Sequence, residues 1–160
     1  IREAIRLFGQ AIAEDPAYAL AYTGLADAYA LHVDYRAVPV VEGMLQARVQ
    51  AEKAIALDEG VAEAHTSLAW VTFIYEWDWD RAGREFRRAI ELNPRSADVW
   101  LSYNYYYLVP TGRLDEAITA ARKAVELDPK QENKWANRAR VLLKQLVEIR
   151  KRRQVVKKGK

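Results

Sequence analysis

The sequence has no cysteine among its 160 residues and only two histidines, His32 and His65. Without cysteine, disulfides and thiolate metal sites are excluded, which fits a reducing compartment such as the cytoplasm. The start of the chain lacks the basic, apolar and small-residue succession of a signal peptide. The longest apolar region, 17–33, includes Asp27 and has helical spacing, so we expect no membrane span. The hydrophobic content of 51% is enough for one domain with an ordinary core.

Motifs for catalysis and phosphate binding are also missing. Neither G-x-x-x-x-G-K-[ST] nor G-x-G-x-x-G occurs, so we expect no phosphate loop. No nucleophile and acid accompany either histidine in a triad pattern, and we expect structural roles for both. Paired carboxylates such as Asp115 and Glu116 lie at predicted helix ends, where capping and solvation explain them. We therefore expect no enzymatic activity, no metal site and no cofactor.

The charge is divided unevenly along the chain. Residues 138–160 contain ten Lys and Arg against one Glu, a net charge of +9. Because the whole chain has a formal charge of +3, residues 1–137 must have −6. An acidic body is thus followed by a basic end, KRRQVVKKGK, which is able to attract phosphate groups. This end lacks interleaved aromatics for base stacking, so we expect a solvated terminus rather than a nucleic-acid site.

What the sequence does contain is an internal repeat. The segments AGREFRRAIELNP (82–94) and AITAARKAVELDP (117–129) share alanines, a leucine and a proline at equivalent places, 35 residues apart. Related spacing recurs in 4–16 and 47–59, and the preceding segments from Ala19, Ala62 and Ala97 also match one another. The pattern predicts repeated helix pairs in which small Ala meets large Phe or Leu at helical spacing. The predicted helices are 2–14, 17–32, 42–57, 61–75, 80–92, 96–109, 114–127 and 131–152.

This pattern resembles the tetratricopeptide repeat (TPR), which has an aromatic, Leu-Gly/Ala and Tyr in its first helix and Ala, an aromatic, Ala and Pro in its second. The resemblance covers about residues 1–142 and implies an all-α fold. That fold is a right-handed α-α superhelix (TPR solenoid) of about three repeats, with a preceding helix and a C-terminal capping helix. The implied limits within a single domain 1–152 are a partial repeat 2–16, repeats 17–59, 60–94 and 95–129, and a capping helix 130–152, followed by a basic tail 153–160.

The spacing departs from the usual repeat of about 34 residues. The spacing is 35 residues from Pro94 to Pro129. It is 43 residues from Ala19 to Ala62, because an insertion in this repeat, HVDYRAVPVVEGM (32–44), delays its second helix. The stretches LAYTGLADAYAL and YEWDWDRAGREFRRAIELNP are also similar to TPR regions of large bacterial regulatory proteins with TolB-like, winged-helix or cyclase domains.

The densest acidic and aromatic stretch, EWDWD (76–80), allows a metal site or a turn between helices. A metal site needs converging oxygen ligands and a tight glycine turn, whereas bulky rings separate these carboxylates and no such glycine is present. We therefore interpret the stretch as a turn, with Asp80 as the N-cap of the following helix.

The TPR resemblance implies a concave groove lined by the second, fifth, ninth and twelfth residues of each first helix. The expected groove residues are Leu20, Thr23, Asp27, Ala30, Glu63, Thr66, Trp70, Phe73, Asp98, Leu101, Tyr105 and Leu108. Family members that clamp a terminal carboxylate use Lys, Arg and Asn at such places, and that clamp is absent here. Two alternatives remain for the aromatics Trp70, Phe73 and Tyr105, which either contact a ligand or are covered by neighbouring helices.

These observations predict a protein-interaction scaffold that binds a peptide or helix in its groove. Because the chain starts at Ile1, without Met and inside a predicted helix, we interpret it as a piece of a longer protein. The resemblance implies that it is a module of a larger bacterial regulatory protein, and we expect a cytoplasmic location. The alternative is a self-association module, a homodimer or other homo-oligomer, whose basic tail contacts anionic partners.

Overall fold

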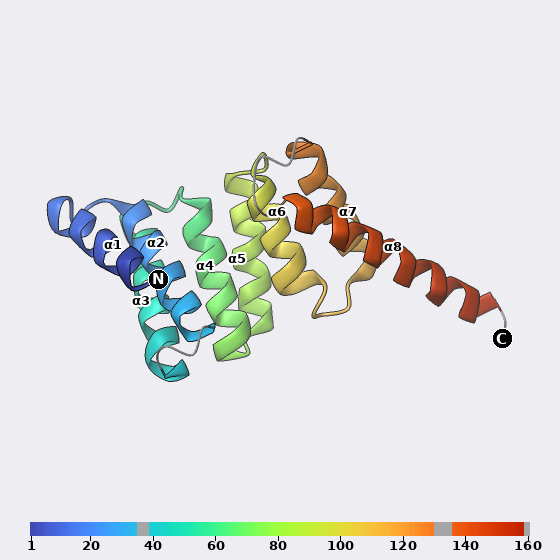
Figure 1. Cartoon of the computed structure of the whole chain (residues 1–160), viewed down its shortest axis with the longest axis horizontal. Coiled ribbons are helices and arrows are strands. Elements are labelled where there is room, and N and C mark those ends of the chain that lie inside the picture. Colours follow the sequence, from blue (N-terminus) through green and yellow to red (C-terminus); the bar gives the residue numbers. More distant parts are fainter. Residues whose placement is uncertain (35–38, 130–135, 159–160) are drawn as a thin grey trace. The chain divides into compact units, whose positions relative to one another are not determined.

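A computed structural model describes residues 1–34, 39–129 and 136–158, and this part of the chain contains helices and no strands (Figure 1). The elements are α1 (Arg2–Glu14), α2 (Ala19–Asp34), α3 (Val40–Leu57), α4 (Ala62–Val71), η1 (Thr72–Glu76), α5 (Trp79–Leu92), α6 (Ala97–Tyr103), η2 (Asn104–Leu108), α7 (Leu114–Leu127) and α8 (Ala136–Lys158). The prediction of an all-α repeat fold is confirmed. With α4 and η1 taken as one helix, and α6 and η2 as another, the helix ends agree with the predicted ones within two residues, except for the last helix. There α8 begins at Ala136 and continues to Lys158, whereas 131–152 was predicted, and residue 131 lies outside the described residues. Part of the 32–44 insertion lies outside the described residues.

The chain divides into two compact units, of which the first comprises Ile1–Leu92. In this unit α1 packs on α2, α2 on α3, α3 on α4, and α4 on α5. The small side chains of Ala26 in α2 and Ala51 in α3 allow these helices to approach each other closely, and both alanines form one buried cluster with Leu68 of α4. Phe86 of α5 is fully buried, as are Ala82 and Ala89 of the same helix. The alternation of small and large residues seen in the sequence is therefore the alternation that packs the core.

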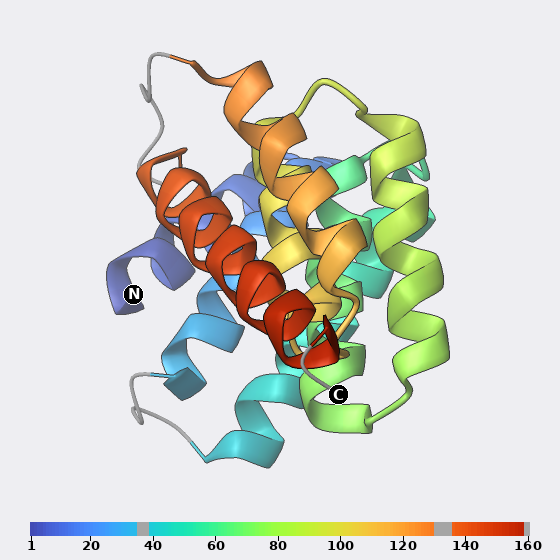
Figure 2. The same ribbon diagram turned by 90° about the vertical axis from the view of Figure 1, so that its right-hand side faces the viewer.

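The second unit comprises Asn93–Lys160. Here α7 packs on α6, on η2 and on α8, and Figure 2 shows α8 running beside α7. Leu101 of α6 and Ala124 of α7 form a buried cluster against which Leu142 of α8 packs. Leu146, one helical turn further along α8, is only 3% exposed. Leu142 and Leu146 of α8 are thus covered, while Lys144 and the four basic residues 150–153 are exposed, as expected for a capping helix.

Two first helices end in a π-helical turn that the sequence did not reveal. α4 continues into η1, and α6 continues into η2. Each π-turn begins with a fully buried polar residue, Thr72 in η1 and Asn104 in η2. The Asn104 Nδ2 donates a hydrogen bond of 2.8 Å to the Ala117 carbonyl oxygen in α7. A π-turn widens the helix locally, and in η2 it presents an amide to the backbone of the neighbouring helix.

The N-cap predicted for the helix after EWDWD is wrong. Helix α5 begins at Trp79, and the Arg81 backbone N–H donates to Asp78 Oδ1 at 2.9 Å. A capping carboxylate reaches the third residue of its helix, which is the relation between Asp78 and Arg81. Asp80 instead lies in the first turn, where its charge complements the helix dipole. The interpretation of EWDWD as a turn between helices is confirmed.

Candidate functional site

Exposed side chains of α2 form a stripe along one face of the helix. Leu20 is 50% exposed, Leu31 is 41% exposed, and Asp27 between them is also exposed. They are seven and four residues apart, which places them on the same side of a helix. Counted from Ala19, they are the second, ninth and thirteenth residues of the first helix of the repeat. We call these three positions, in each repeat, the first-helix stripe.

The equivalent positions of the other two repeats keep this character, with one exception. In α4 and η1 the stripe consists of Glu63, Trp70 and Ile74, and in the second unit it consists of Asp98, Tyr105 and Val109. All of these are exposed except Trp70, whose side chain is buried at 7% exposure. The thirteenth position is thus an exposed aliphatic residue in every repeat: Leu31, Ile74 or Val109.

The residues expected to line a groove fall into three classes. Exposed are Leu20, Asp27, Glu63, Asp98 and Tyr105; half-buried are Thr66 and Phe73; buried are Thr23, Ala30, Trp70, Leu101 and Leu108. The alternative left open for the aromatics thus has a different outcome for each: Trp70 is covered and Tyr105 reaches solvent. Sequence reasoning missed the thirteenth positions, although their recurrence as Leu, Ile and Val was a usable signal. The groove itself remains a prediction.

Asp27 has an unusual electrostatic environment on this stripe. The residue as a whole is exposed, but its carboxyl is surrounded by atoms of neighbouring helices, and this desolvation raises its pKa to about 6. The Ser67 hydroxyl, 2.5 Å from Asp27 Oδ1, opposes the shift by donating a hydrogen bond, while repulsion from Glu63 adds to it. Asp27 therefore carries a charge that the surrounding helices disfavour, and a cationic ligand group would stabilise it.

His65 has the structural contacts expected of it. This residue of α4 is buried, with its ring Nδ1 2.8 Å from Oε2 of Glu85 in the middle of α5. Nε2 lies 3.2 Å from the Glu59 carbonyl oxygen. Both ring nitrogens are engaged in joining elements of the first unit, so this histidine is not available for ligand chemistry.

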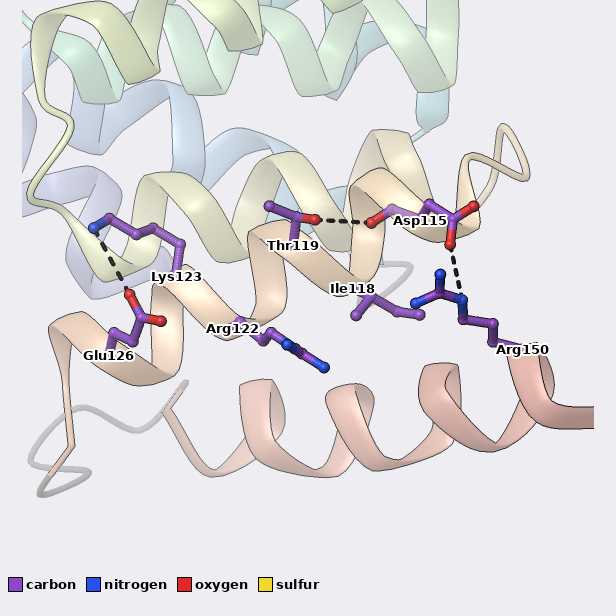
Figure 3. A pocket seen from close by; sticks show the side chains of 7 residues that line it. All are labelled: Asp115, Ile118, Thr119, Arg122, Lys123, Glu126 and Arg150. Carbon is purple, nitrogen blue, oxygen red and sulfur yellow. Dashed lines mark hydrogen bonds and ion pairs between the residues drawn. The ribbon is translucent and has the colours of Figure 1, made fainter.

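A hollow in the second unit lies between α7 and α8 and has a volume of about 360 Å³ (Figure 3). Its lining is mostly charged, and the charges are largely paired: Asp115 Oδ1 lies 3.1 Å from Arg150 Nε, and Lys123 Nζ lies 3.8 Å from Glu126 Oε2. Arg122 and the aliphatic Ile118 also point into this hollow. The arrangement has no nucleophile or base in a productive pair, and no side chain that would select one ligand.

Among the residues that the structure describes, no group of three or more His, Cys, Asp or Glu side chains is arranged to hold a metal ion. No helix within the described ranges has both the length and the apolar character needed to cross a membrane.

Comparisons with known proteins concern the fold. A scan against protein-family models and a search of curated proteins give no significant match. Among solved structures, TTC0263, a thermophilic TPR protein of Thermus thermophilus, superposes with a TM-score of 0.72 at 22% identity, over 89% of this chain and 71% of that chain. YrrB, a TPR protein with an unusual peptide-binding site, superposes with a TM-score of 0.61 at 22% identity, over 88% of this chain and 64% of that chain.

The TPR domain of Arabidopsis OM64 gives a TM-score of 0.54 at 18% identity, over 78% of this chain and 96% of that domain. The structure therefore confirms the resemblance seen in the sequence: the chain has the tetratricopeptide-repeat fold.

Proposed function

We propose that the chain is a scaffold that binds a peptide or helix of a partner protein along the first-helix stripe. The observation that carries this proposal is the exposed aliphatic side chain at the thirteenth position of each repeat, Leu31, Ile74 and Val109. In the first unit, Leu31 and Ile74 offer apolar contacts on two successive first helices, which an amphipathic helix or an extended peptide is able to use. By resemblance to bacterial regulatory proteins, this scaffold is a cytoplasmic module of a larger protein.

Similarity to YrrB supports a peptide as the ligand, because that protein has the same fold and a peptide-binding site. The fold by itself does not define a function, so the exposed side chains must indicate the kind of ligand. The second and ninth positions supply acids, Asp27 and Glu63 in the first unit and Asp98 in the second. A ligand with apolar anchors and cationic side chains complements this set in both respects.

Selection from a random dodecapeptide library, with the purified chain as target, tests this function. The variant Leu31→Ser with Ile74→Ser serves as counter-target, and the affinity of each selected peptide is measured for both proteins. We expect a loss of at least about tenfold, because two buried aliphatic contacts contribute about 1–3 kcal/mol at an interface.

A matched control is Leu7→Ser, which alters an equally exposed leucine on α1, outside the stripe. Both altered positions of the double variant are exposed, so its helicity should equal that of the wild type. Selected peptides that bind the double variant and the wild type equally would refute the assignment of the stripe.

The alternative of self-association has one specific observation in its favour. Residues 150–153 of α8 place four consecutive cationic side chains in solvent, where they are able to contact an acidic surface of another copy. Light scattering over a range of protein concentrations distinguishes the two functions, since a dissociable dimer is expected only from self-association.

A further inference from the structure

The turn between η1 and α5 exposes two tryptophans that the proposed stripe does not include. Trp77 is 72% exposed and Trp79 is 49% exposed. Trp77 also has φ 59° and ψ 16°, in the left-handed region where bulky side chains are rare. Glycine adopts this conformation without steric cost. The chain thus has a large, solvent-exposed ring at a position that folding alone would give to glycine.

Three rings stand in a row at this turn, which we call the aromatic turn (Phe73, Trp77 and Trp79). Phe73 stacks on Trp79 with ring centroids 6.0 Å apart and an interplanar angle of 26°. Trp77 lies on Trp79 with centroids 6.3 Å apart and an angle of 37°. The inner rings support Trp77, which ends the row and has most of its surface in water.

Exposed carboxylates stand beside the tryptophans at this turn, since Asp78 and Asp80 alternate with Trp77 and Trp79 in the sequence and are exposed. Two nearby cations are already engaged, because Arg48 pairs with Glu76 at 2.9 Å and Arg81 pairs with both Glu76 and Glu52 at 3.3 Å. Arg84, one helical turn after Asp80 in α5, is an exposed cation. Within the described residues no cation lies over the Trp77 ring and none pairs with Asp80. An open aromatic face beside two carboxylates is complementary to a positive charge.

We propose that the aromatic turn binds an arginine- or lysine-bearing segment of a partner protein, with a cation over the Trp77 ring and the Asp78 and Asp80 carboxylates beside it. Indole is the aromatic side chain that attracts cations most strongly, and guanidinium also stacks on its face. Neighbouring carboxylates add Coulomb attraction that weakens with salt. This contact lies outside the first-helix stripe and is independent of it.

Binding of a defined probe to the whole chain tests the proposal. The probe is a synthetic peptide of five Gly-Arg pairs, and the control probe has citrulline, the neutral isostere of arginine, at each arginine. Each tryptophan gives one indole N–H signal in a proton–nitrogen NMR spectrum. We expect the arginine peptide to shift the Trp77 and Trp79 signals while the citrulline peptide leaves them in place.

Trp77→Gly is the most informative variant, because it removes the ring and also suits the positive φ. It should raise the thermal midpoint of unfolding and weaken peptide binding about fivefold. Asp80→Asn should weaken binding about threefold and reduce its salt dependence. Glu14→Gln, which removes an exposed carboxylate on α1, is the matched control and should leave binding unchanged.

Equal binding of both peptides, unmoved Trp77 and Trp79 signals, or full affinity of Trp77→Gly would overturn the proposal. Self-association of the wild type that disappears in Trp77→Gly would assign the turn to a second copy instead, and would also overturn it. The variant Leu31→Ser with Ile74→Ser should bind the arginine peptide normally, so the outcome here is separate from that for the stripe.

Discussion

At the scale of single residues, Asp27 combines an exposed position with a destabilised charge. Its pKa is raised to about 6 in the folded chain, while an unfolded aspartate titrates at about 3.9. Between these values the folded state binds more protons than the unfolded state, so the Asp27 contribution to stability falls as the pH rises from about 4 to about 6. Above about pH 6 the Asp27 carboxylate is charged and lowers the stability of the fold, and a ligand cation would reduce this loss of stability.

Asp27→Asn should therefore stabilise the chain at pH 7.5 and have little effect at pH 4. We expect a gain of at most about 1 kcal/mol, since solvent access screens much of the effect of the shift. The measurement is urea unfolding at both pH values. Glu14→Gln is the control, because it removes another exposed carboxylate from a helix of the same unit. A gain of equal size at pH 4 and pH 7.5 would show that the charge of Asp27 is not its cause.

At the scale of elements, the packing of α1 on α2 includes one very close approach, between Phe8 and Gly24. A Cβ added at Gly24 of α2 would lie 2.3 Å from the Phe8 ring of α1, so the glycine leaves the space that this ring occupies. No side chain of α1 is fully buried, and Phe8 is one of its half-buried apolar residues. The phenylalanine and the glycine are therefore a matched pair.

Gly24→Ala should destabilise the chain by about 1–3 kcal/mol, because the ring of Phe8 must move. Gly9→Ala is the opposite case, since nothing lies within 4 Å of the added Cβ and alanine favours the helix by about 0.5–1 kcal/mol. Thermal unfolding followed by circular dichroism measures both. If the two substitutions shift the midpoint in the same direction, the packing of Phe8 on Gly24 is not as described.

An element was predicted correctly from the sequence where neighbouring residues in the chain determine it. Helix α7 was predicted at its observed limits because alanines at helical spacing and a following Asp-Pro mark both its face and its end. The π-turns were missed because the burial of Thr72 and Asn104 depends on neighbouring helices rather than on local pattern. The choice of Asp78 over Asp80 as N-cap depends on where the chain leaves its left-handed turn at Trp77.

The prediction of surface residues was less accurate for a related reason. Turning a helix about its axis by one residue changes which of its positions face solvent. The alignment with the TPR pattern does not determine this rotation. In α2 the buried residue is Ala30 and the exposed one is Leu31; in η2 and its cap they are Leu108 and Val109. The aromatic turn was predicted to be a turn. The positive φ of Trp77 and the exposure of its ring were not predicted, because no sequence pattern at this position indicated them.

At the scale of the whole molecule, cohesion comes from contacts between successive helices. The described contacts join successive helices or, as for α2 and α4, helices two places apart, so the effect of a core substitution is expected to fade within about one helix pair. α8 shows this principle most directly, because it is held to α7 through Leu142 and Leu146. A change at Leu146 should therefore act locally.

Leu146→Ala should increase amide hydrogen exchange in α8 and at the facing side of α7, because a buried leucine loses about 2–5 kcal/mol of contacts when it is truncated. Exchange in α2–α5 should stay unchanged, since these helices belong to the other compact unit. Hydrogen–deuterium exchange with mass spectrometry resolves the two regions, and Val141→Ala, at a half-exposed position of the same helix, is the control. If exchange instead rises equally in 19–92 and in α8, the chain unfolds as one cooperative body, and nearest-neighbour packing does not describe its stability.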